Sequence, residues 1–501
     1  MIFRDWLNGL EYTLLQGSVD VETEDVIYDS RKAAPGKVFV AMKGIRVDGH
    51  SFIPQVLKAG VRVLVTERPV EEELKNSGLS EDELKQVTVV MVEEGRHALA
   101  LLSAARFDHP AKKLVMIGVT GTKGKTTTTH MIRAILLAAG KKVGMIGTTG
   151  TVIGYVVTPT LNTTPESYEL HQAFAQMVEA GCEYAVMEVS SQGIKMHRTD
   201  GLYFNYAIFT NISPDHIGPG EHADFEEYLY YKTRLLNMCG IGLVNKDDEH
   251  APQIIKAANC ELYTYSEESK EADFVASDIR YVSQPDFVGT EFHISGKYDM
   301  EVRLGIPGLF NVVNALAAVS VCSFLGLDQA RISHALENIR VNGRMEIVYT
   351  SERCTVLVDY AHNAVSMESL LSTLRDYKPK RLVCVFGCGG NRSKDRRYSM
   401  GEIGGKMADL SIITADNSRY EKVEDIIADI RGSIEKTGGK FIEIPDRREA
   451  IRYSILHAQP GDMVAVIGKG HEDYQEINGV RHHFLDREVI EETVKELGEK
   501  A

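Results

Sequence analysis

Three glycines precede Lys125 and four threonines follow it in MIGVTGTKGKTTTTHMI, residues 116–132. At such a turn, backbone N–H groups can wrap phosphate oxygens, the glycines allow close approach, and the lysine supplies a positive charge. A threonine hydroxyl directly after the lysine can bind Mg²⁺. Because an apolar run precedes this segment and a helical run follows it, the segment predicts a phosphate-binding loop between a strand and a helix.

The loop departs from the strict GxxxxGK[ST] template, because Val119 stands where the first glycine is expected. Gly118 and Gly121 instead give a shifted arrangement around GTKGKTT. The alternative interpretation is a glycine-rich turn with a solvated lysine. The flanking strand and helix patterns favour the phosphate-binding loop.

Polar residues also close the next strand-like runs. Glu188 ends the strand in YAVMEVSSQG, and His216 follows YAIFTNISP. Each alone is typical of a solvated strand end, but beside a phosphate-binding loop they predict ligands for Mg²⁺. Lys232, in EEYLYYKTRLLN, has no marked spacing. Taken alone, it predicts a surface lysine.

In the last third of the chain, four strand-like runs are each followed by a polar loop, namely DYAH, GCGGNR, DNSR and GKGHED. Open α/β sheets bind ligands at the carboxyl ends of their strands, so these loops predict one crevice. GCGGNR is not a dinucleotide fingerprint, because Arg392 stands where GxGxxG needs glycine. HEDYQ lacks the second histidine of a zinc-protease motif.

Alternating strand-like and helical runs predict an α/β fold with mostly parallel sheets. A chain of 501 residues is too long for a single core, so we expect three domains. Composition and pattern shifts place them at 1–109, 110–342 and 343–501.

Charge and composition limit the function classes. Asp and Glu number 71 against 56 Lys and Arg, a net charge of −15 that argues against a general nucleic-acid or membrane binder. No apolar run reaches the length of a membrane span. The 7 scattered cysteines predict reduced thiols in a cytoplasm.

Eleven motifs resemble the Mur ligase family and follow one another in its order: GTKGKTT, LNTTP, MEVSS, TNISPDH, YYKTRLL, FNVVNALAA, GRMEI, DYAH, FGCGGNR, DNSR and GKGHEDYQ. The resemblance implies a cytoplasmic enzyme of peptidoglycan precursor synthesis, with a uridine-nucleotide domain, a P-loop ATPase domain and a Rossmann-like amino-acid domain. Within the family, the chain resembles the branch that adds a diamino acid to UDP-N-acetylmuramoyl-L-alanyl-D-glutamate.

The family resemblance implies that ATP converts a substrate carboxylate into an acyl phosphate, which an amine then attacks, with the help of Mg²⁺. It assigns catalysis to Lys125, Lys232, Glu188 and His216. The metal ligands it implies are Thr126, Glu188, His216 and Lys232, the last one as an N-carboxylated carbamate. The implied ATP-binding residues are Gly121, Thr122, Lys123, Gly124, Lys125, Thr126, Thr127, Asn311, Arg344 and Asp359.

For the UDP-sugar peptide, the resemblance points to Ser30, His50, Asn162, Thr163, Thr164, Ser190 and Arg198. Two departures from the family pattern affect this substrate site. Met196 stands where relatives often place a polar residue, and IGPGEHADF at 217–225 replaces a more usual aromatic-His-Gly segment.

For the amino acid, the choice lies between meso-diaminopimelate and L-lysine, which differ by one carboxylate. A guanidinium suits a carboxylate, and Arg419 in DNSR therefore favours meso-diaminopimelate. Ser418 replaces the proline of the more usual DNPR. The implied site comprises Arg392, Asp416, Asn417, Ser418, Arg419, Gly468 and Glu472.

Two other function classes remain open from the sequence. One is another Mur-type ligase such as folylpolyglutamate synthase, and the other is a nucleotide-dependent switch or scaffold. We expect a monomer that binds no nucleic acid and does not insert into a membrane.

Overall fold

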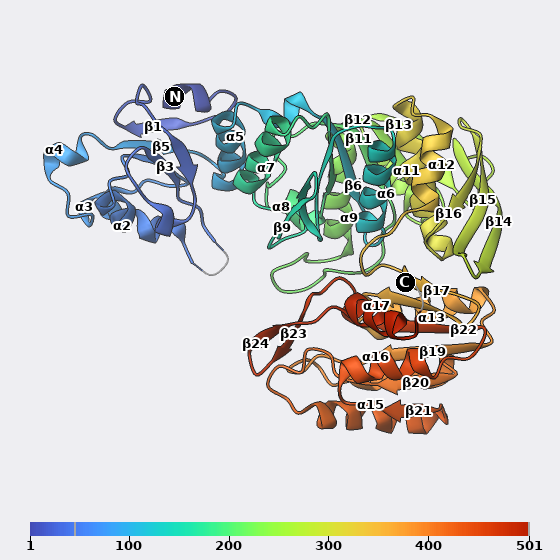
Figure 1. Cartoon of the computed structure of the whole chain (residues 1–501). Coiled ribbons are helices and arrows are strands. Elements are labelled where there is room, and N and C mark those ends of the chain that lie inside the picture. Colours follow the sequence, from blue (N-terminus) through green and yellow to red (C-terminus); the bar gives the residue numbers. More distant parts are fainter. Residues whose placement is uncertain (45–46, 499–501) are drawn as a thin grey trace. The chain divides into compact units, whose positions relative to one another are not determined.

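A computed structural model describes residues 1–44 and 47–498 (Figure 1). The chain forms two compact units, Met1–Tyr265 and Ser266–Ala501, and each is described by itself. No helix within the described ranges is long and apolar enough to cross a membrane.

The first unit begins with a five-stranded sheet in the order β1-β5-β4-β3-β2, parallel except for β1. Its elements are α1 (Phe3–Trp6), β1 (Thr13–Gln16), β2 (Asp25–Ile27), η1 (Ser30–Lys32), β3 (Lys37–Val40), η2 (Gly49–Phe52), α2 (Ile53–Lys58), β4 (Val63–Thr66), α3 (Glu71–Lys75), α4 (Glu81–Leu84), β5 (Thr88–Met91) and α5 (Gly95–Arg106).

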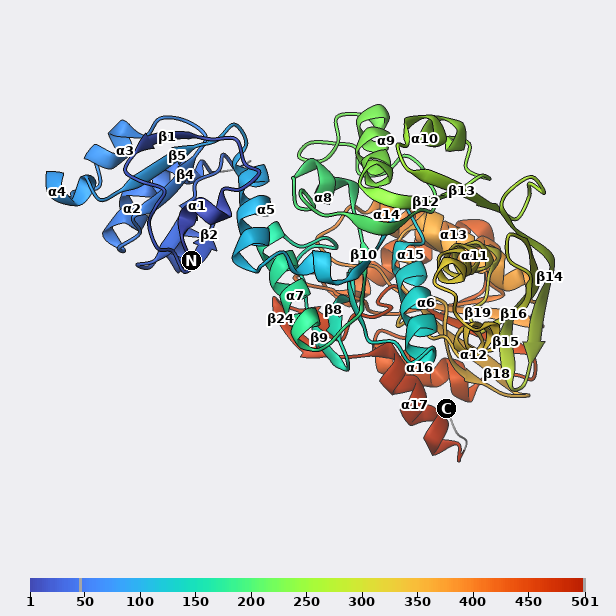
Figure 2. The ribbon, with the colours of Figure 1, turned by 90° about the horizontal axis from the view of Figure 1, so that it is seen from above.

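Alternate residues of these strands face opposite sides, so each face needs its own apolar cover. Val38 and Val40 pack in one cluster with Leu99 of α5. Phe39, between them, packs in another cluster with Val56 of α2. The sheet therefore lies between α5 and α2, as Figure 2 shows.

The second sheet of this unit has the order β13-β12-β11-β6-β10-β7-β8-β9 and is parallel except at β8 and β9. Its elements are η3 (Pro110–Lys113), β6 (Val115–Thr120), α6 (Lys125–Ala138), β7 (Val143–Gly147), β8 (Gly150–Ile153), β9 (Val156–Thr158), α7 (Ser167–Glu179), β10 (Tyr184–Glu188), α8 (Ser191–Lys195), β11 (Phe204–Phe209), α9 (Phe225–Thr233), η4 (Arg234–Asn237), β12 (Cys239–Asn245), α10 (Ala251–Ala257) and β13 (Glu261–Ser266).

The apolar run before the phosphate-loop segment forms β6, and the strand-like runs in YAVMEVSSQG and YAIFTNISP form β10 and β11, so these predictions are confirmed. The register pairs Glu188, the last residue of β10, with Val119 of β6. Because β6 and β10 are parallel neighbours, the Glu188 carboxylate lies beside the start of the phosphate-loop segment.

The second unit contains an antiparallel β14–β16 meander and a six-stranded sheet in the order β17-β18-β22-β19-β20-β21, parallel except for β17. Its elements are β14 (Phe274–Gln284), β15 (Phe287–Gly296), β16 (Met300–Leu304), α11 (Leu309–Phe324), α12 (Gln329–Glu337), β17 (Glu346–Thr350), β18 (Cys354–Asp359), α13 (Ala364–Asp376), β19 (Arg381–Phe386), α14 (Asp395–Met407), β20 (Leu410–Ile413), α15 (Val423–Thr437), β21 (Phe441–Glu443), α16 (Arg447–Leu456), β22 (Asp462–Ile467), β23 (Tyr474–Ile477), β24 (Val480–His483) and α17 (Asp486–Glu496).

The four polar loops predicted to converge follow β18, β19, β20 and β22, which are parallel neighbours in this sheet. The α/β fold predicted from the sequence is thus confirmed. The expected domain limits at 109 and 342 stay predictions.

A fully buried ion pair joins the last two long helices of this unit. Arg447 begins α16, and both its Nε and Nη2 donate to the Asp486 carboxylate of α17 at 2.7 Å. The same guanidinium donates to the carbonyls of Ala415, two residues after β20, and of Ile467, the last residue of β22. Burial alone would lower the pKa of Arg447, but Asp486 raises it above its ordinary value. The pair therefore fixes the strand ends that carry two of the polar loops.

We predict that Arg447→Met lowers the free energy of unfolding of the second unit by about 3–5 kcal/mol, because it leaves the Asp486 charge buried and uncompensated. Urea denaturation followed by circular dichroism measures this loss.

The matched control is Arg452→Met, on the same helix. Arg452 pairs with Glu496 of α17, but their side chains are 27% and 54% exposed. This change should cost about 1 kcal/mol or less. Equal losses in the two variants would contradict the structural role given to Arg447.

Candidate active site

The phosphate-loop segment has the backbone that close approach to an anion requires. Gly121 has φ of +142°, and a Cβ there would lie 1.9 Å from Thr210 Oγ1. Gly124 has φ of +86° and precedes α6, whose first turn has no side-chain cap. The uncapped helix start leaves N–H donors facing the loop, as a phosphate site needs. The residues present therefore fit a bound triphosphate.

The Glu188 carboxylate, only 1% exposed, is the centre of the polar contacts next to this loop. Thr126 Oγ1 donates to Oε1 and Oε2 of Glu188 at 3.0 and 3.1 Å. Thr148, just after β7, donates its backbone N–H at 2.9 Å and its hydroxyl at 3.2 Å. Thr126 and Glu188, which the family resemblance suggests as metal ligands, are thus in direct contact.

Two lysine ammonium groups converge on one carbonyl of the loop. Lys125 Nζ and Lys232 Nζ each lie 2.7 Å from the Gly121 oxygen. Lys232 is 2% exposed, so the surface position expected for this lysine taken alone is wrong. The side chain extends from α9 to the phosphate loop, and no local sequence pattern predicts this contact. Burial and the charge of Lys125 lower the pKa of the Lys232 amine well below its ordinary value.

The Tyr228 ring connects Lys232 and His216 to the loop. Lys232 Nζ lies 4.7 Å from the ring centroid, and the His216 ring lies 6.2 Å from it. The Tyr228 hydroxyl is 3.1 Å from Thr122 Oγ1. The His216 side chain is 57% exposed and contacts Glu221 through Nδ1 at 3.2 Å. Its role as a metal ligand beside Glu188 stays a prediction.

The LNTTP segment also lies against Glu188. Thr163 Oγ1 is 3.1 Å from Thr148 Oγ1. Thr164 Oγ1 donates to the Glu188 carbonyl at 3.0 Å and accepts the Ser190 N–H at 2.9 Å. The threonines expected at the UDP-sugar peptide are therefore connected to the carboxylate expected at the metal.

The other residues expected at that substrate are placed as follows. Ser190 caps α8 by accepting the Gly193 N–H at 3.0 Å. Arg198 donates to the Thr164 carbonyl at 3.0 Å and pairs with Glu166 at 2.7 Å. Asn162 is exposed.

Ser30 and His50 lie in the N-terminal part of this unit. Ser30 begins η1, which Asp29 caps. His50 is buried, and its Nε2 accepts the Glu67 N–H at 3.0 Å, so Nδ1 carries a proton toward Asp48 at 2.6 Å. Both ring nitrogens of His50 thus stabilise the local chain, and its contact with substrate stays a prediction.

In the second unit, Asn311 is buried near the start of α11 and donates to the Pro307 carbonyl at 2.7 Å. The Arg344 guanidinium lies 4.8 Å from the Tyr360 ring centroid. Asp359 accepts the N–H groups of Met345 and Ala361, each at 2.8 Å, while burial raises the pKa of its carboxyl. The contacts with ATP that are predicted for these three residues stay predictions.

The DNSR and GKGHED loops meet through Asn417. Its side-chain amide donates to Glu472 at 2.9 Å, and its oxygen accepts the Glu476 N–H at 2.9 Å. Lys469, fully buried, lies 3.3 Å from Asn417 Oδ1 and 3.4 Å from Glu472. Gly468 has φ of +111°, a conformation that residues with a side chain rarely adopt, and a Cβ there would lie 2.7 Å from the Asp416 carboxylate.

Arg419 connects the DNSR loop to two neighbours. Its Nη1 donates to the Gly390 carbonyl of GCGGNR at 2.7 Å, and its Nε lies 3.4 Å from Glu476 of β23. Its φ of +53° is in the left-handed region. Ser418 is buried beside it, whereas Arg392 is exposed. DYAH also meets GKGHED, because the Gly468 N–H donates to the Asp359 carbonyl at 3.2 Å and the Tyr360 and His471 ring centroids lie 5.0 Å apart. All four predicted loops therefore converge, as the sheet rule predicted.

Comparison with known proteins gives three family matches. The Mur ligase middle domain matches residues 119–322, the Mur ligase glutamate ligase domain matches 343–470, and the Mur ligase family catalytic domain matches 23–107. The chain belongs to the Mur ligase family. The fold and the motif resemblance agree with this assignment.

Individual relatives of this Mur ligase are similar over almost their whole length. The UDP-N-acetylmuramoyl-L-alanyl-D-glutamate–2,6-diaminopimelate ligase of Caldanaerobacter subterraneus subsp. tengcongensis is 38% identical, over 98% of both chains. The ligase of the same name from Clostridium perfringens is 37% identical, over 98% of this chain and 99% of its own. A solved structure of a protein with that name has a TM-score of 0.72 and 30% identity, covering 95% of this chain and 96% of its own.

Sequence reasoning missed two polar residues of this Mur ligase that support the predicted sites. Thr148 follows β7 and could have been found by the strand-end rule that selected Glu188. Lys469 lies inside GKGHED, where a lysine between glycines suggests solvent exposure, yet it is fully buried. Its ammonium also donates to the Tyr474 carbonyl, so it joins the GKGHED loop to β23.

We predict that Lys469→Met loosens the contact between the DNSR loop and β23. The change removes the cation beside Glu472, and an uncompensated buried acceptor costs on the order of 1–3 kcal/mol. The Glu476 amide should therefore exchange roughly ten- to a hundredfold faster in hydrogen-exchange measurements.

Lys406→Met is the control. Lys406 is an exposed lysine paired with Glu402 along α14. Its replacement should leave the Glu476 amide unchanged, and unchanged exchange in Lys469→Met would contradict the role given to Lys469.

Proposed function

We propose that this Mur ligase joins a free diamino acid, meso-diaminopimelate, to UDP-N-acetylmuramoyl-L-alanyl-D-glutamate in an ATP-dependent reaction of peptidoglycan precursor synthesis. The names and similarity of the relatives support this substrate pair. The observation that carries the proposal is the pair of contacts at Glu188. Thr126 of the phosphate loop and the Thr163–Thr148 link from the substrate segment both end on this one carboxylate.

The residues around Glu188 suit Mg²⁺, which prefers carboxylate and hydroxyl oxygens. Thr126 and Glu188 would hold the ion, with His216 and a carboxylated Lys232 as further groups. When bound, the ion neutralises phosphate charge while a carboxylate and a triphosphate meet. Side chains of the protein would carry out the other steps of binding and orientation.

Lys125 would place a fixed positive charge at the phosphates, so that the anionic carboxylate can approach the transferred phosphoryl group. The glycine loop and the start of α6 would hold the phosphates in line with the carboxylate. The resulting acyl phosphate is attacked by the amine of the diamino acid, and inorganic phosphate leaves. Thr163 and Thr164 would orient the acceptor through their contacts beside Glu188.

Lys232 would act as a carbamate. The neutral amine attacks CO₂, a C–N bond forms and a proton leaves, which turns a cation into an anion. Deep burial and the adjacent Lys125 ammonium favour the uncharged amine. The anion would then attract the Lys125 ammonium, with which it shares the Gly121 carbonyl, instead of repelling it.

The far end of the diamino acid would meet Arg419. A guanidinium offers two parallel donors to a carboxylate, and its partners Gly390 and Glu476 hold the Arg419 side chain in place. Glu472 suits the ammonium group of the same ligand, with Arg392, Asp416, Asn417, Ser418 and Gly468 completing the pocket. Because Glu476 partly neutralises Arg419, the pocket attracts one carboxylate without carrying a large positive charge.

We predict that Lys232→Ala lowers turnover on the order of a hundredfold or more, since a charge that positions the metal is lost. A short carboxylic acid added at high concentration should restore part of the activity by replacing the carbamate. Phosphate release with ATP, the UDP-muramoyl dipeptide and meso-diaminopimelate measures both effects.

Lys256→Ala, an exposed lysine of α10 in the same unit, is the control and should keep full turnover. Full turnover in Lys232→Ala would remove the carbamate from the mechanism. An increase in the turnover of Lys256→Ala on addition of the same acid would show that the acid acts elsewhere.

We predict that the unmodified enzyme prefers meso-diaminopimelate to L-lysine, and that Arg419→Ala loses about 2 kcal/mol of transition-state binding, roughly thirtyfold in kcat/KM for meso-diaminopimelate. The loss for L-lysine should be smaller, because it lacks the second carboxylate. The same phosphate-release assay across a panel of amino acids tests the whole proposal.

Arg431→Ala, a partly exposed arginine of α15 paired with Glu443, is the control and should leave the preference unchanged. Equal or better use of L-lysine would overturn the amino-acid assignment, but the assignment as a ligase would stand. Phosphate release from ATP alone, unaffected by the dipeptide and amino acid, would instead favour a nucleotide-dependent switch.

A further inference from the structure

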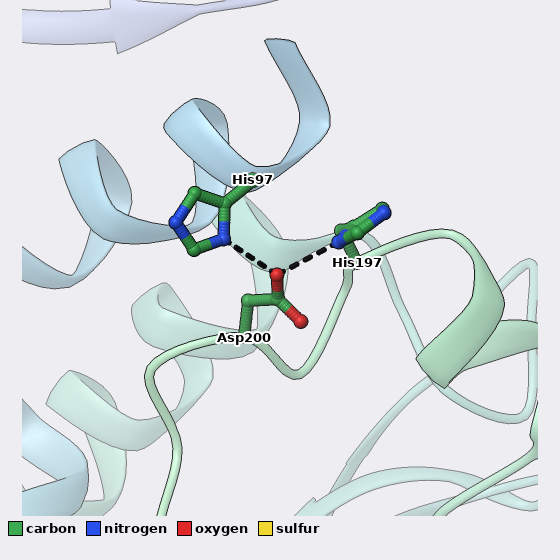
Figure 3. A group of neighbouring side chains, drawn as sticks. All are labelled: His97, His197 and Asp200. Carbon is green, nitrogen blue, oxygen red and sulfur yellow. Dashed lines mark hydrogen bonds and ion pairs between the residues drawn. The ribbon is translucent and has the colours of Figure 1, made fainter. Parts of the chain in front are cut away.

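Two histidines and one aspartate lie together outside the sites described above. His97 projects from α5, and His197 and Asp200 project from the loop that follows α8 (Figure 3). Both imidazoles turn Nδ1 toward the same carboxylate oxygen, Asp200 Oδ2, at 2.6 and 2.8 Å. The two rings are nearly perpendicular, with centroids 6.3 Å apart. One residue of α5 and two residues about a hundred positions later thus bring two imidazole nitrogens to one carboxylate oxygen.

These three side chains are the set that a transition-metal ion requires. One ligand atom from each lies within 4.8 Å of the ligand atoms of the other two. Imidazole nitrogen and carboxylate oxygen are common Zn²⁺ ligands, and a tetrahedral zinc holds its ligand atoms about 3.3 Å apart. Each of the two present contacts would therefore open by roughly half an ångström.

The electrostatics of the cluster favour a cation. Burial alone would raise the pKa of Asp200, but hydrogen bonds from His197 and His97 hold it below its ordinary value, so the carboxyl is an anion. Glu94 adds negative charge near His197, and Arg96 adds positive charge. Within the described residues, Asp200 Oδ1 accepts no hydrogen bond, which leaves a second ligand oxygen.

The cluster is also open to exchange with solvent. The side chains of His97, His197 and Asp200 are 42%, 39% and 22% exposed. An ion can therefore reach the carboxylate without unfolding of either element, and a water molecule can take the remaining coordination position.

We propose that His97, His197 and Asp200 bind a divalent transition-metal ion of the Zn²⁺ class. On binding, each neutral imidazole carries its proton on Nε2 and presents the Nδ1 lone pair to the metal. The metal ion then takes the place of the two Nδ1 protons that point toward Asp200 Oδ2. The bound ion joins α5 to the loop that carries Arg198, and so links the N-terminal sheet region to a residue expected at the UDP-sugar peptide.

Titration of the whole protein with Co²⁺ and Zn²⁺, in excess Mg²⁺, tests this proposal without an activity assay. Co²⁺ should give visible absorption bands of a low-coordinate N/O site, and Zn²⁺ should abolish them. Zn²⁺ should also raise the unfolding temperature, as any ligand of the native state does. In His97→Gln and Asp200→Asn, the Zn²⁺ affinity should fall roughly tenfold or more.

Two controls separate this site from others on the chain. His334→Gln, an exposed histidine of α12, and Glu188→Gln, in the predicted Mg²⁺ site, should both keep the Co²⁺ bands. Circular dichroism establishes that His97→Gln and Asp200→Asn are folded, and either variant alone suffices for the test. Unchanged Zn²⁺ binding in a folded variant, or no saturable binding by the unmodified protein, would overturn the proposal and leave a metal-free hydrogen-bonded cluster.

Discussion

A carboxylate buried at the end of a parallel strand has to be compensated where it lies, and Glu188 imposes this requirement on the first unit. The compensation comes from Thr126 and Thr148, which arrive from the loops after β6 and β7. These loops belong to the strands on either side of β10. Hydroxyl and amide groups supply only partial charges, so the carboxylate keeps a strong preference for a cation. The Glu188 carboxylate is thus the group that the phosphate loop, the substrate segment and the predicted metal site share.

The two lysine ammonium groups of the same site are also constrained by their surroundings. Lys125 and Lys232 share the Gly121 carbonyl, and two full ammonium charges at that separation would repel strongly in a buried setting. Loss of the proton by Lys232 relieves the repulsion and produces the nucleophilic amine. The phosphate loop therefore contains one lysine suited to hold charge and one suited to give it up, although both are the same residue type.

The strands and the phosphate loop could be predicted because their signals are local. Apolar runs, glycines and capping residues act within a few positions, as when Asp328 caps α12 by accepting the Ala330 N–H. The burial of Lys232 could not be predicted, because its contact with Gly121 spans 111 positions. The position of Thr148 after a strand was predictable, but its contact with Glu188 was not. Thr148 follows β7 and Glu188 ends β10, and these strands are adjacent in the sheet but not in the sequence. Which strand-end residues contact each other is therefore known only once the sheet order is known.

The buried pair of Arg447 and Asp486 has a consequence for biosynthesis. The guanidinium is made well before the carboxylate that neutralises it, and it occupies the interior beside the ends of β20 and β22. Until Asp486 has left the ribosome, this part of the chain cannot close around Arg447 without burying an unpaired charge. We therefore expect the region around Arg447 to close only after Asp486 of α17 has been synthesised.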